Sequence, residues 1–430
     1  MTAPVLPASP VRKGTFRSLG TFNYRLWAGG ALVSNIGTWM QRTAQDWIVL
    51  VQLTHHNATS VGIVMGLQFG PQLLLLPLTG YAADRYDRRK ILLVTQTCMG
   101  LLALGLGLLT VFGLVQLWHV YLFALGLGCV TAFDSPARQT FVSELVGEEH
   151  LSNAVALNST SFNAARMMGP AVAGILIAGV GTGWVFLINA LSFAGVLIAL
   201  NFLRLDQLYR KDKKHATRGR LLDGFRYVWS RPDLKAAFMM LFLIGAFGLN
   251  FPIFISTMAV TVFHAGADQF GLLTSTMAIG SVSGALLSAR REKPRVAFVL
   301  LAAVTFGSGL ALGAVMPTFA LYGFALVIVG ASAQTFTTTL NSAIQLSVDP
   351  GMRGRVMAIY LAIALGTTPI GAPIVGWVAD TFGARWSLCV GAAAGFGAAL
   401  VGVHYLVRHR NLRLRMDAGR LRFSLGALEA

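Results

Sequence analysis

The chain has 430 residues, of which 55% are hydrophobic and only 12% are charged. This polar share is too small to cover a water-soluble globule of that length, so the composition excludes a soluble protein and indicates a polytopic membrane protein. The formal net charge of +17 does not indicate nucleic-acid binding, because the cations fall in short segments between long apolar runs.

Apolar runs long enough to span a bilayer follow one another along the chain. In the first half we expect membrane helices at residues 26–53, 60–81, 90–113, 117–138, 153–180 and 183–203. In the second half we expect them at 237–263, 269–289, 296–315, 318–342, 355–380 and 385–407. The sequence therefore predicts an all-α fold of twelve transmembrane helices in two pseudo-symmetric six-helix bundles.

The most hydrophilic internal stretch, residues 204–235, is expected to be a central loop between an N-terminal bundle at 1–203 and a C-terminal bundle at 236–407. A basic tail at 408–430 follows. At a single offset between the halves, Gly174 aligns with Gly376 and Gly181 with Gly383. Such parallel repeats favour a transporter with its substrate cavity between the two halves.

The positions of the cations predict the orientation in the membrane. All but Arg42, Arg166 and Arg385 of the 34 Lys and Arg residues fall in segments that one orientation assigns to the cytoplasm. Because cytoplasmic loops carry the excess of Lys and Arg, both termini and the central loop are expected on that side of a bacterial inner membrane. The N-terminus lacks the apolar run of a cleavable signal.

One densely charged loop separates the second and third apolar runs, Gly80-Tyr-Ala-Ala-Asp84-Arg85-Tyr-Asp-Arg88-Arg89-Lys90. Together with the twelve-helix count, it resembles the signature between helices 2 and 3 of the major facilitator superfamily. Four further stretches resemble the exporter branch that includes the enterobactin exporter and multidrug efflux permeases. They are Trp39-Met-Gln41-Arg42, Asp134-Ser-Pro-Ala-Arg138-Gln139, Asn163-Ala-Ala-Arg166-Met-Met-Gly169-Pro170 and Phe186-Leu-Ile-Asn189-Ala-Leu-Ser192-Phe193.

The resemblance implies a cytoplasmic gate at this loop. In the family, the aspartate of the loop is thought to sit at the cytoplasmic end of the second half, and the first arginine to pair with an acid of helix 4. The matching residues are Asp84, Arg85 and Asp134. The other candidate gate residues are Gly80, Arg88, Arg89 and Arg138. The alternative is a loop that only sets the topology, although topology requires cations and leaves Asp84 unexplained.

Polar residues inside the expected helices are candidates for the substrate and proton pathway. Helix 1 carries Thr38, Gln41, Arg42, Gln45 and Asp46 on one broad face. Arg42 and Asp46 can compensate each other, so either transport work or structural pairing would explain them. Further candidates from helices 5, 7 and 10 are Asn163, Asn250 and Gln334.

Arg166 is expected near the midplane of helix 5, about fourteen residues from the start of that helix. A cation at this depth needs an anionic partner, for which Asp46, Asp134 or an anionic group of the substrate would serve. The alternative is an internal strut between helices.

Glycine and proline residues in helices 5 and 11 are expected to bend the helices and to allow close packing. They are Gly169, Pro170, Gly174 and Pro373. The first three resemble the antiporter signature of drug exporters, although Ala165 stands where a glycine is usual. No phosphate-binding Gly-x-x-x-x-Gly-Lys-[Ser/Thr] sequence is present, so the energy is expected to come from an ion gradient or from the gradient of the substrate itself. We favour a proton gradient, and we expect no cofactor and no metal.

These features predict a secondary active transporter, not an enzyme. We expect proton-coupled export of amphipathic small molecules, such as drugs, siderophores or secondary metabolites, by a monomer in the lipid bilayer. An uptake or facilitated-diffusion permease is the alternative among transporters. A sensor or scaffold that does not transport is the alternative of another class, and charges within the membrane argue against it.

Overall fold

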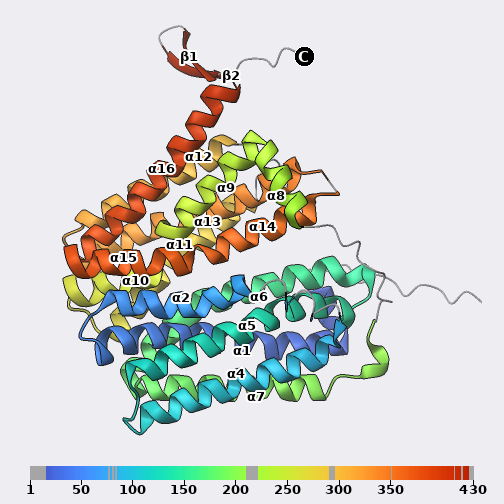
Figure 1. Ribbon diagram of the computed structural model, residues 1–430. Helices are drawn as coiled ribbons and strands as arrows, with labels where there is room; N and C mark the ends of the chain where they lie inside the picture. The colour runs from blue at the N-terminus through green and yellow to red at the C-terminus, as the bar shows by residue number, and fades with distance from the viewer. Residues whose placement is uncertain are drawn as a thin grey trace, which may run out of the picture.

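The computed structural model describes residues 16–75, 78–79, 82, 85–209, 221–289, 296–349, 351–410, 412–417 and 420–425. The helices form two bundles that lie side by side (Figure 1). The N-terminal half contains α1 (Phe22–Trp47), α2 (Ala58–Leu74), α4 (Arg88–Val111), α5 (Leu117–Leu145), α6 (Glu148–Val180) and α7 (Thr182–Asn201). The C-terminal half contains α8 (Leu221–Ser230), α9 (Pro232–Leu243), α10 (Phe251–Thr257), α11 (Ala267–Ala289), α12 (Val296–Val315), α13 (Phe319–Ser347), α14 (Arg353–Gly366), α15 (Thr368–Phe382) and α16 (Ala384–Arg410).

Short turns of other helix types extend or join these elements. Residues 17–20 and 205–207 form 3₁₀ turns. Residues 48–53 continue α1 as a π-helical stretch, and two further π-helical stretches at 244–248 and 258–262 flank α10. Because π-helical segments often mark functional sites, the interrupted span from α9 to α10 is a candidate for the lining of a cavity.

Among the described residues, ten helical segments are long and apolar enough to cross a membrane. Two more helices complete the bundles: α1, which packs on α6 and α7, and α2, which packs on α5. The predicted fold class, an all-α polytopic membrane protein with two six-helix bundles, is confirmed. The pairs α14 with α15 and α9 with α10 each form one span from two helices.

The two ends of the bundles differ in charge. We call the end that carries Arg88, Arg138, Arg204, Arg231 and Arg353 the basic end. The opposite end carries the connections at 54–57, 112–116, 263–266, 316–318 and residue 383. In Figure 1 the two halves lie close together at the opposite end, on the left, and their helices diverge toward the basic end, on the right.

Caps and glycines set the helix boundaries at the opposite end. The side chain of Asn57 accepts a hydrogen bond of 2.7 Å from the backbone N–H of Ser60 and so begins α2. Gly181 ends α6 with a φ of +88°, and Gly383 ends α15 with a φ of +101°, a conformation that only glycine adopts at little cost. These two glycines are the pair that the internal repeat aligns.

Small residues allow the halves to pack backbone to backbone where α2 crosses α15 and α6 crosses α11. A Cβ added to Gly376 would lie 2.5 Å from the carbonyl oxygen of Ala58. One added to Gly174 would lie 2.7 Å from the carbonyl oxygen of Ala267 and from the Cα of Gly271. No side chain fits at either crossing, so Gly174 serves close packing between the halves.

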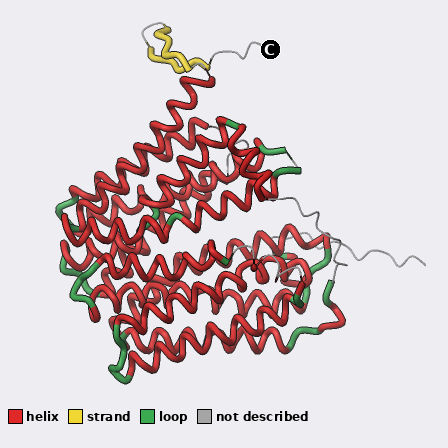
Figure 2. The backbone as a smooth tube through the Cα atoms, in the orientation of Figure 1, coloured by secondary structure: helices red, strands yellow, loops and turns green. Residues whose placement is uncertain are grey.

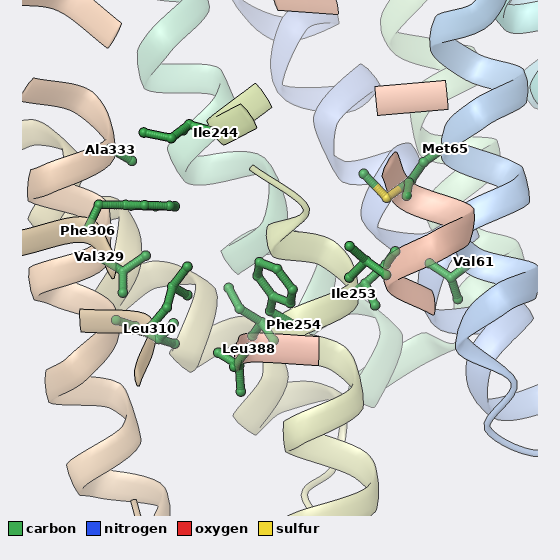
Figure 3. Close-up of a cluster of buried hydrophobic side chains, with 14 of the residues drawn as sticks. Val61, Met65, Ile244, Ile253, Phe254, Phe306, Leu310, Val329, Ala333 and Leu388 are labelled. Atoms are coloured by element: carbon green, nitrogen blue, oxygen red, sulfur yellow. The ribbon is translucent and has the colours of Figure 1, made fainter. Parts of the chain in front are cut away.

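The largest apolar cluster extends through both halves. Figure 3 shows Val61 and Met65 of α2 near Ile253 of α10, with Phe254 and Phe306 deeper in the C-terminal half. All five side chains are 5% exposed or less. This continuous apolar packing holds the two bundles together beside the polar residues that lie between them.

One detail differs from the sequence prediction. The eleventh span breaks at Thr367, between α14 and α15, where Pro369 lies in the first turn of α15. A proline is easily accommodated there because its missing N–H would have no helical partner. Pro373 lies inside α15 and Pro170 inside α6, and the bending expected of both residues stays a prediction.

The basic tail contains secondary structure that the sequence reasoning did not predict. Strands β1 (Leu412–Asp417) and β2 (Arg420–Leu425) pair antiparallel, with Leu412 opposite Leu425. Figure 2 shows this hairpin in yellow beyond the end of α16.

Candidate transport cavity

A cavity of about 250 Å³ lies between the two halves. Residues of α1, α2 and α6 line it from the N-terminal half, and residues of α10, α11, α13 and α15 line it from the other. Its charged lining residues are Arg42, Asp46 and Arg166. The uncharged polar lining residues are Thr43, Gln68, Thr274, Ser281, Gln334, Thr337 and Thr368, and the aromatic ones are Trp39, Phe69, Phe251 and Phe270.

Arg42 lies against aromatic rings at one wall of this cavity. Its guanidinium carbon is 4.7 Å from the ring centroid of Phe69 and 5.3 Å from that of Trp39. The residue is only 9% exposed, and its Nε has no hydrogen-bond partner among the described residues. Trp39 reaches Arg42 because residues three apart share a helix face. The two rings stabilise the buried cation by cation–π attraction.

Asp46 is 5% exposed, and its Oδ1 accepts no hydrogen bond from any described residue. Among the described residues no hydrogen bond or contact short enough for an ion pair joins Asp46 to Arg42, but the two opposite charges attract each other, as expected from their spacing. The guanidinium of Arg42 lies over the rings of Trp39 and Phe69. The Oδ1 of Asp46 still lacks a hydrogen-bond donor among these residues, so Asp46 is available for a proton or for a donor group of a ligand.

Arg166 makes its hydrogen bond across the boundary between the halves. Its Nη2 donates to the Oε1 of Gln334 on α13 at 3.1 Å. We expected an anionic partner from Asp46 or Asp134, but neither forms an ion pair with Arg166 among the described residues. Within the described part of the chain the partner of Arg166 is therefore a neutral amide and not a carboxylate.

The other expected pathway residues lie around the cavity without lining it. Gln41 accepts a hydrogen bond of 2.6 Å from Asn189 of α7, inside the N-terminal bundle. Gln45 accepts one of 2.8 Å from Gln68, which does line the cavity. Thr38 donates to the backbone carbonyl of Ser34.

Asn163 and Asn250 each donate to a carbonyl of their own span. The amide of Asn163 bonds to the carbonyl oxygen of Ser159 at 2.8 Å, on an exposed part of α6. The fully buried Asn250 bonds to that of Ala246 at 2.6 Å, and so compensates the helix break before α10. Residues on either side of Asn250, Leu249 and Phe251, line the cavity.

Sequence reasoning did not select several lining residues, among them Gln68, Thr274 and Thr337. Gln68 had a usable signal, because a glutamine in the middle of an apolar run must find a polar partner or face a cavity. The two threonines gave no such signal, because the hydroxyl of a threonine in a membrane helix can donate to the backbone carbonyl one turn back, as that of Thr274 does to Phe270.

The candidate gate residues lie at the basic end. Asp134 is 3% exposed and accepts hydrogen bonds of 2.8 Å from Thr95, 2.6 Å from Gln96 and 2.9 Å from Arg138. Its ion-pair partner among the described residues is Arg138, which lies four residues later on the same face of α5. The expected pairing of Asp134 with Arg85 is not seen among them and stays a prediction.

The remaining gate residues make contacts within the N-terminal half. Arg88 forms an ion pair with Glu144 of α5, and the Nε of Arg89 donates to the carbonyl oxygen of Leu200 at 2.8 Å. Gly80 and Asp84 lie outside the described residues.

A second polar contact between the halves lies at the opposite end. Asp380 of α15 accepts hydrogen bonds from the backbone N–H groups of Ala58 at 2.6 Å and Thr59 at 2.8 Å, and from the hydroxyl of Thr59 at 2.5 Å. This carboxylate caps the first turn of α2, where the helix dipole favours a negative charge. Sequence reasoning missed Asp380 because its partner lies in the other half.

Comparisons with known proteins agree with this architecture. A family model described as transmembrane secretion effector matches residues 6–418. The staphyloferrin A transporter of Staphylococcus aureus is 25% identical over 387 residues, which cover 89% of this chain and 95% of that protein. The enterobactin exporter EntS of Shigella flexneri is 27% identical over 365 residues, which cover 84% of this chain and 85% of that protein.

Solved structures of low sequence identity share the fold. A bacterial homologue of the human lysosomal transporter Spinster, in an inward-facing and unoccupied conformation, matches with a TM-score of 0.67 and 16% identity, over 90% of this chain and 96% of that one. A D-xylose–proton symporter matches with a TM-score of 0.70 and 13% identity, over 90% of this chain and 98% of that one.

Proposed function

Because the chain belongs to the transmembrane secretion effector family of the major facilitator superfamily, we propose that it exports amphipathic small molecules, with the proton gradient as its energy source. The single observation that carries this proposal is the cavity between the halves, in which Arg42, Asp46 and Arg166 meet apolar and aromatic walls. Buried ionisable residues in membrane helices are expensive, and they mark substrate or proton pathways.

The proposed orientation places the basic end in the cytoplasm, together with both termini. The excess of Lys and Arg at that end supports it. Arg385 is the cation that we expected in an outer loop, and a structural role explains its position at the opposite end. Its guanidinium donates to the carbonyl oxygens of Ala314 at 2.7 Å and Met316 at 3.1 Å, where α12 ends.

In this orientation the protein works by alternating access. The halves are joined at the outer end by the Asp380 contact and by the glycine crossings of α2 with α15 and α6 with α11. A substrate would enter from the cytoplasm, where the helices diverge (Figure 1), and leave after the outer contacts open and the inner ones close. The transporter would act as a monomer, because each chain contains both halves.

Asp46 is the proposed proton carrier. It lines the cavity, is almost completely buried, and has an Oδ1 without a partner among the described residues. The other candidate acid, Asp134, is fully engaged with Thr95, Gln96 and Arg138 in the gate region. The names of the two relatives favour siderophores and similar metabolites as substrates of this chain.

The test is accumulation of fluorescent amphipathic probes of negative, zero and positive charge in everted membrane vesicles, whose cytoplasmic face is outside. An exporter accumulates at least one probe when the vesicles are energised, and an uncoupler or the Asp46→Asn variant abolishes this. Accumulation that persists unchanged with the gradient collapsed would contradict proton coupling. Accumulation only in right-side-out vesicles would indicate uptake, and none in either orientation would favour a sensor or scaffold.

A further inference from the structure

We propose that the substrates carry an organic anion together with at least one O–H or N–H donor, and that Arg166 is the residue that binds the anion. This inference rests on the proposed function, because it names the chemistry that the same cavity would recognise. The charge that we infer for the ligand does not depend on which gradient drives transport.

The first observation is the charge balance of the cavity. Among the described residues, its lining contains two cations, Arg42 and Arg166, and one anion, Asp46, and the other lining residues are uncharged. With all three ionised, the cavity carries one excess positive charge in a region that membrane helices surround. Arg166 lines the cavity and is an exposed residue, so its guanidinium is open to a ligand, and the excess positive charge favours a ligand that brings a counter-charge.

The second observation identifies Arg166 as the uncompensated cation. Arg42 already lies over the rings of Phe69 and Trp39, which attract it. Among the described residues, the hydrogen-bond partner of Arg166 is neutral, the Oε1 of Gln334 at 3.1 Å. A carboxylate or similar anion accepts stronger hydrogen bonds from a guanidinium than an amide does, and so can displace Gln334 from Arg166.

This displacement has a structural consequence. The hydrogen bond from Arg166 to Gln334 joins α6 of one half to α13 of the other. An anion bound to Arg166 would replace a direct contact between the halves with one that passes through the ligand. Ligand binding and the relative position of the halves would therefore be coupled at this residue.

The third observation indicates which other chemical groups the ligand carries. Asp46 lines the same cavity, and its carboxylate, whose Oδ1 has no hydrogen-bond partner among the described residues, can accept a hydrogen bond from a hydroxyl or amine of the substrate. The apolar walls of Phe251, Phe270, Met167 and Met277 suit a planar or aromatic body. A hydroxylated aromatic acid combines the three features.

The test compares two probes of nearly identical size, 3-hydroxy-2-naphthoate and 3-hydroxy-2-naphthamide, which differ by one negative charge. Their binding to the purified full-length protein in nanodiscs is measured by titration calorimetry without any gradient. We expect the naphthoate to bind about tenfold more tightly than the naphthamide, because a hydrogen bond from Arg166 is stronger when its acceptor is charged. The Arg166→Gln variant should lose this preference.

Two controls separate charge from folding. Arg166→Lys keeps the cation and should retain part of the preference, and Arg25→Gln removes an exposed cation of α1 outside the cavity and should retain all of it. Equal affinity for the two probes, no binding of the naphthoate up to millimolar concentration, or an unchanged preference in Arg166→Gln would each overturn the proposal. Because the binding measurement uses no gradient, the two proposals can fail separately. If proton-driven export fails, the naphthoate should still bind more tightly than the naphthamide. If this preference is absent, export can still be measured in vesicles.

Discussion

Asp380 and Thr59, which are 321 residues apart in the chain, are joined by two hydrogen bonds, because the Oδ2 of Asp380 accepts from both the backbone N–H and the hydroxyl of Thr59. The Oδ1 accepts a third bond from the N–H of Ala58. One carboxylate of the C-terminal half therefore holds the first turn of a helix of the N-terminal half. The opposite end of the molecule cannot open without breaking these bonds.

Replacing Asp380 with Ala should favour opening at this end. Each lost bond to a charged acceptor is worth about 1.5–3 kcal/mol, so the open population should rise about tenfold or more. The measurement uses Phe270→Cys, in a background where Cys98, Cys129 and Cys389 are replaced by Ser. Phe270 is 3% exposed and stacks on Trp47 of the other half, so an impermeant maleimide that is added to the outer side of intact cells reaches this site only after opening of this end.

The matched control is Asp268→Ala. Asp268 lies in the first turn of α11 at the same end, and it makes no hydrogen bond to the other half among the described residues. Its loss should leave the labelling rate unchanged. An equal rate in Asp380→Ala and in the parent would show that the Asp380 contact does not hold this end closed.

Gly174→Val should prevent the same end from closing. A Cβ at residue 174 meets the backbone of α11 at 2.7 Å, and backbone atoms cannot move aside cheaply. Transport per folded molecule should fall about tenfold or more, because overpacking costs on the order of 1–3 kcal/mol. Gly179→Val is the control on the same helix, since a Cβ at residue 179 has nothing within 4 Å. Transport that is equal in the two variants would refute the role of this crossing.

Asp134→Ala should destabilise the N-terminal half. The carboxylate of Asp134 is 3% exposed, and its loss leaves Arg138, Thr95 and Gln96 without their shared acceptor. Removing one partner of a buried ion pair costs about 3–5 kcal/mol, so the midpoint of thermal unfolding in detergent should fall by several degrees. Glu149→Ala, which removes a side chain that is 61% exposed, should leave the midpoint unchanged. Equal midpoints would mean that the network contributes little.

The sequence predicted the twelve spans, their division into two halves and the equivalence of Gly181 with Gly383, because length, apolarity and glycine spacing are local properties of a membrane helix. It could not predict the partners of charged residues. Arg166 bonds to Gln334 and Asp380 bonds to Thr59, and both pairs join the two halves. Helical spacing indicated that Arg42 and Asp46 attract each other, but it could not predict that the rings of Trp39 and Phe69 hold Arg42, because Phe69 comes from another helix.

One ion pair could have been predicted from helix spacing alone. Asp134 and Arg138 are four residues apart on α5, which is the spacing of an ion pair on one helix face. The pairing of Asp134 with Arg85, which the resemblance implies, stays a prediction. Local geometry was sufficient for Arg138, because a residue on the same helix needs no tertiary movement to reach its partner.

The most direct test of proton-coupled export is to record proton movement and probe movement together, with purified protein in proteoliposomes that contain a pH-sensitive dye. Adding a transported probe to the cytoplasmic face should carry the probe inward to the lumen and protons out of it in wild type, with no proton movement in Asp46→Asn. Probe movement at the wild-type rate without any proton movement would contradict the account.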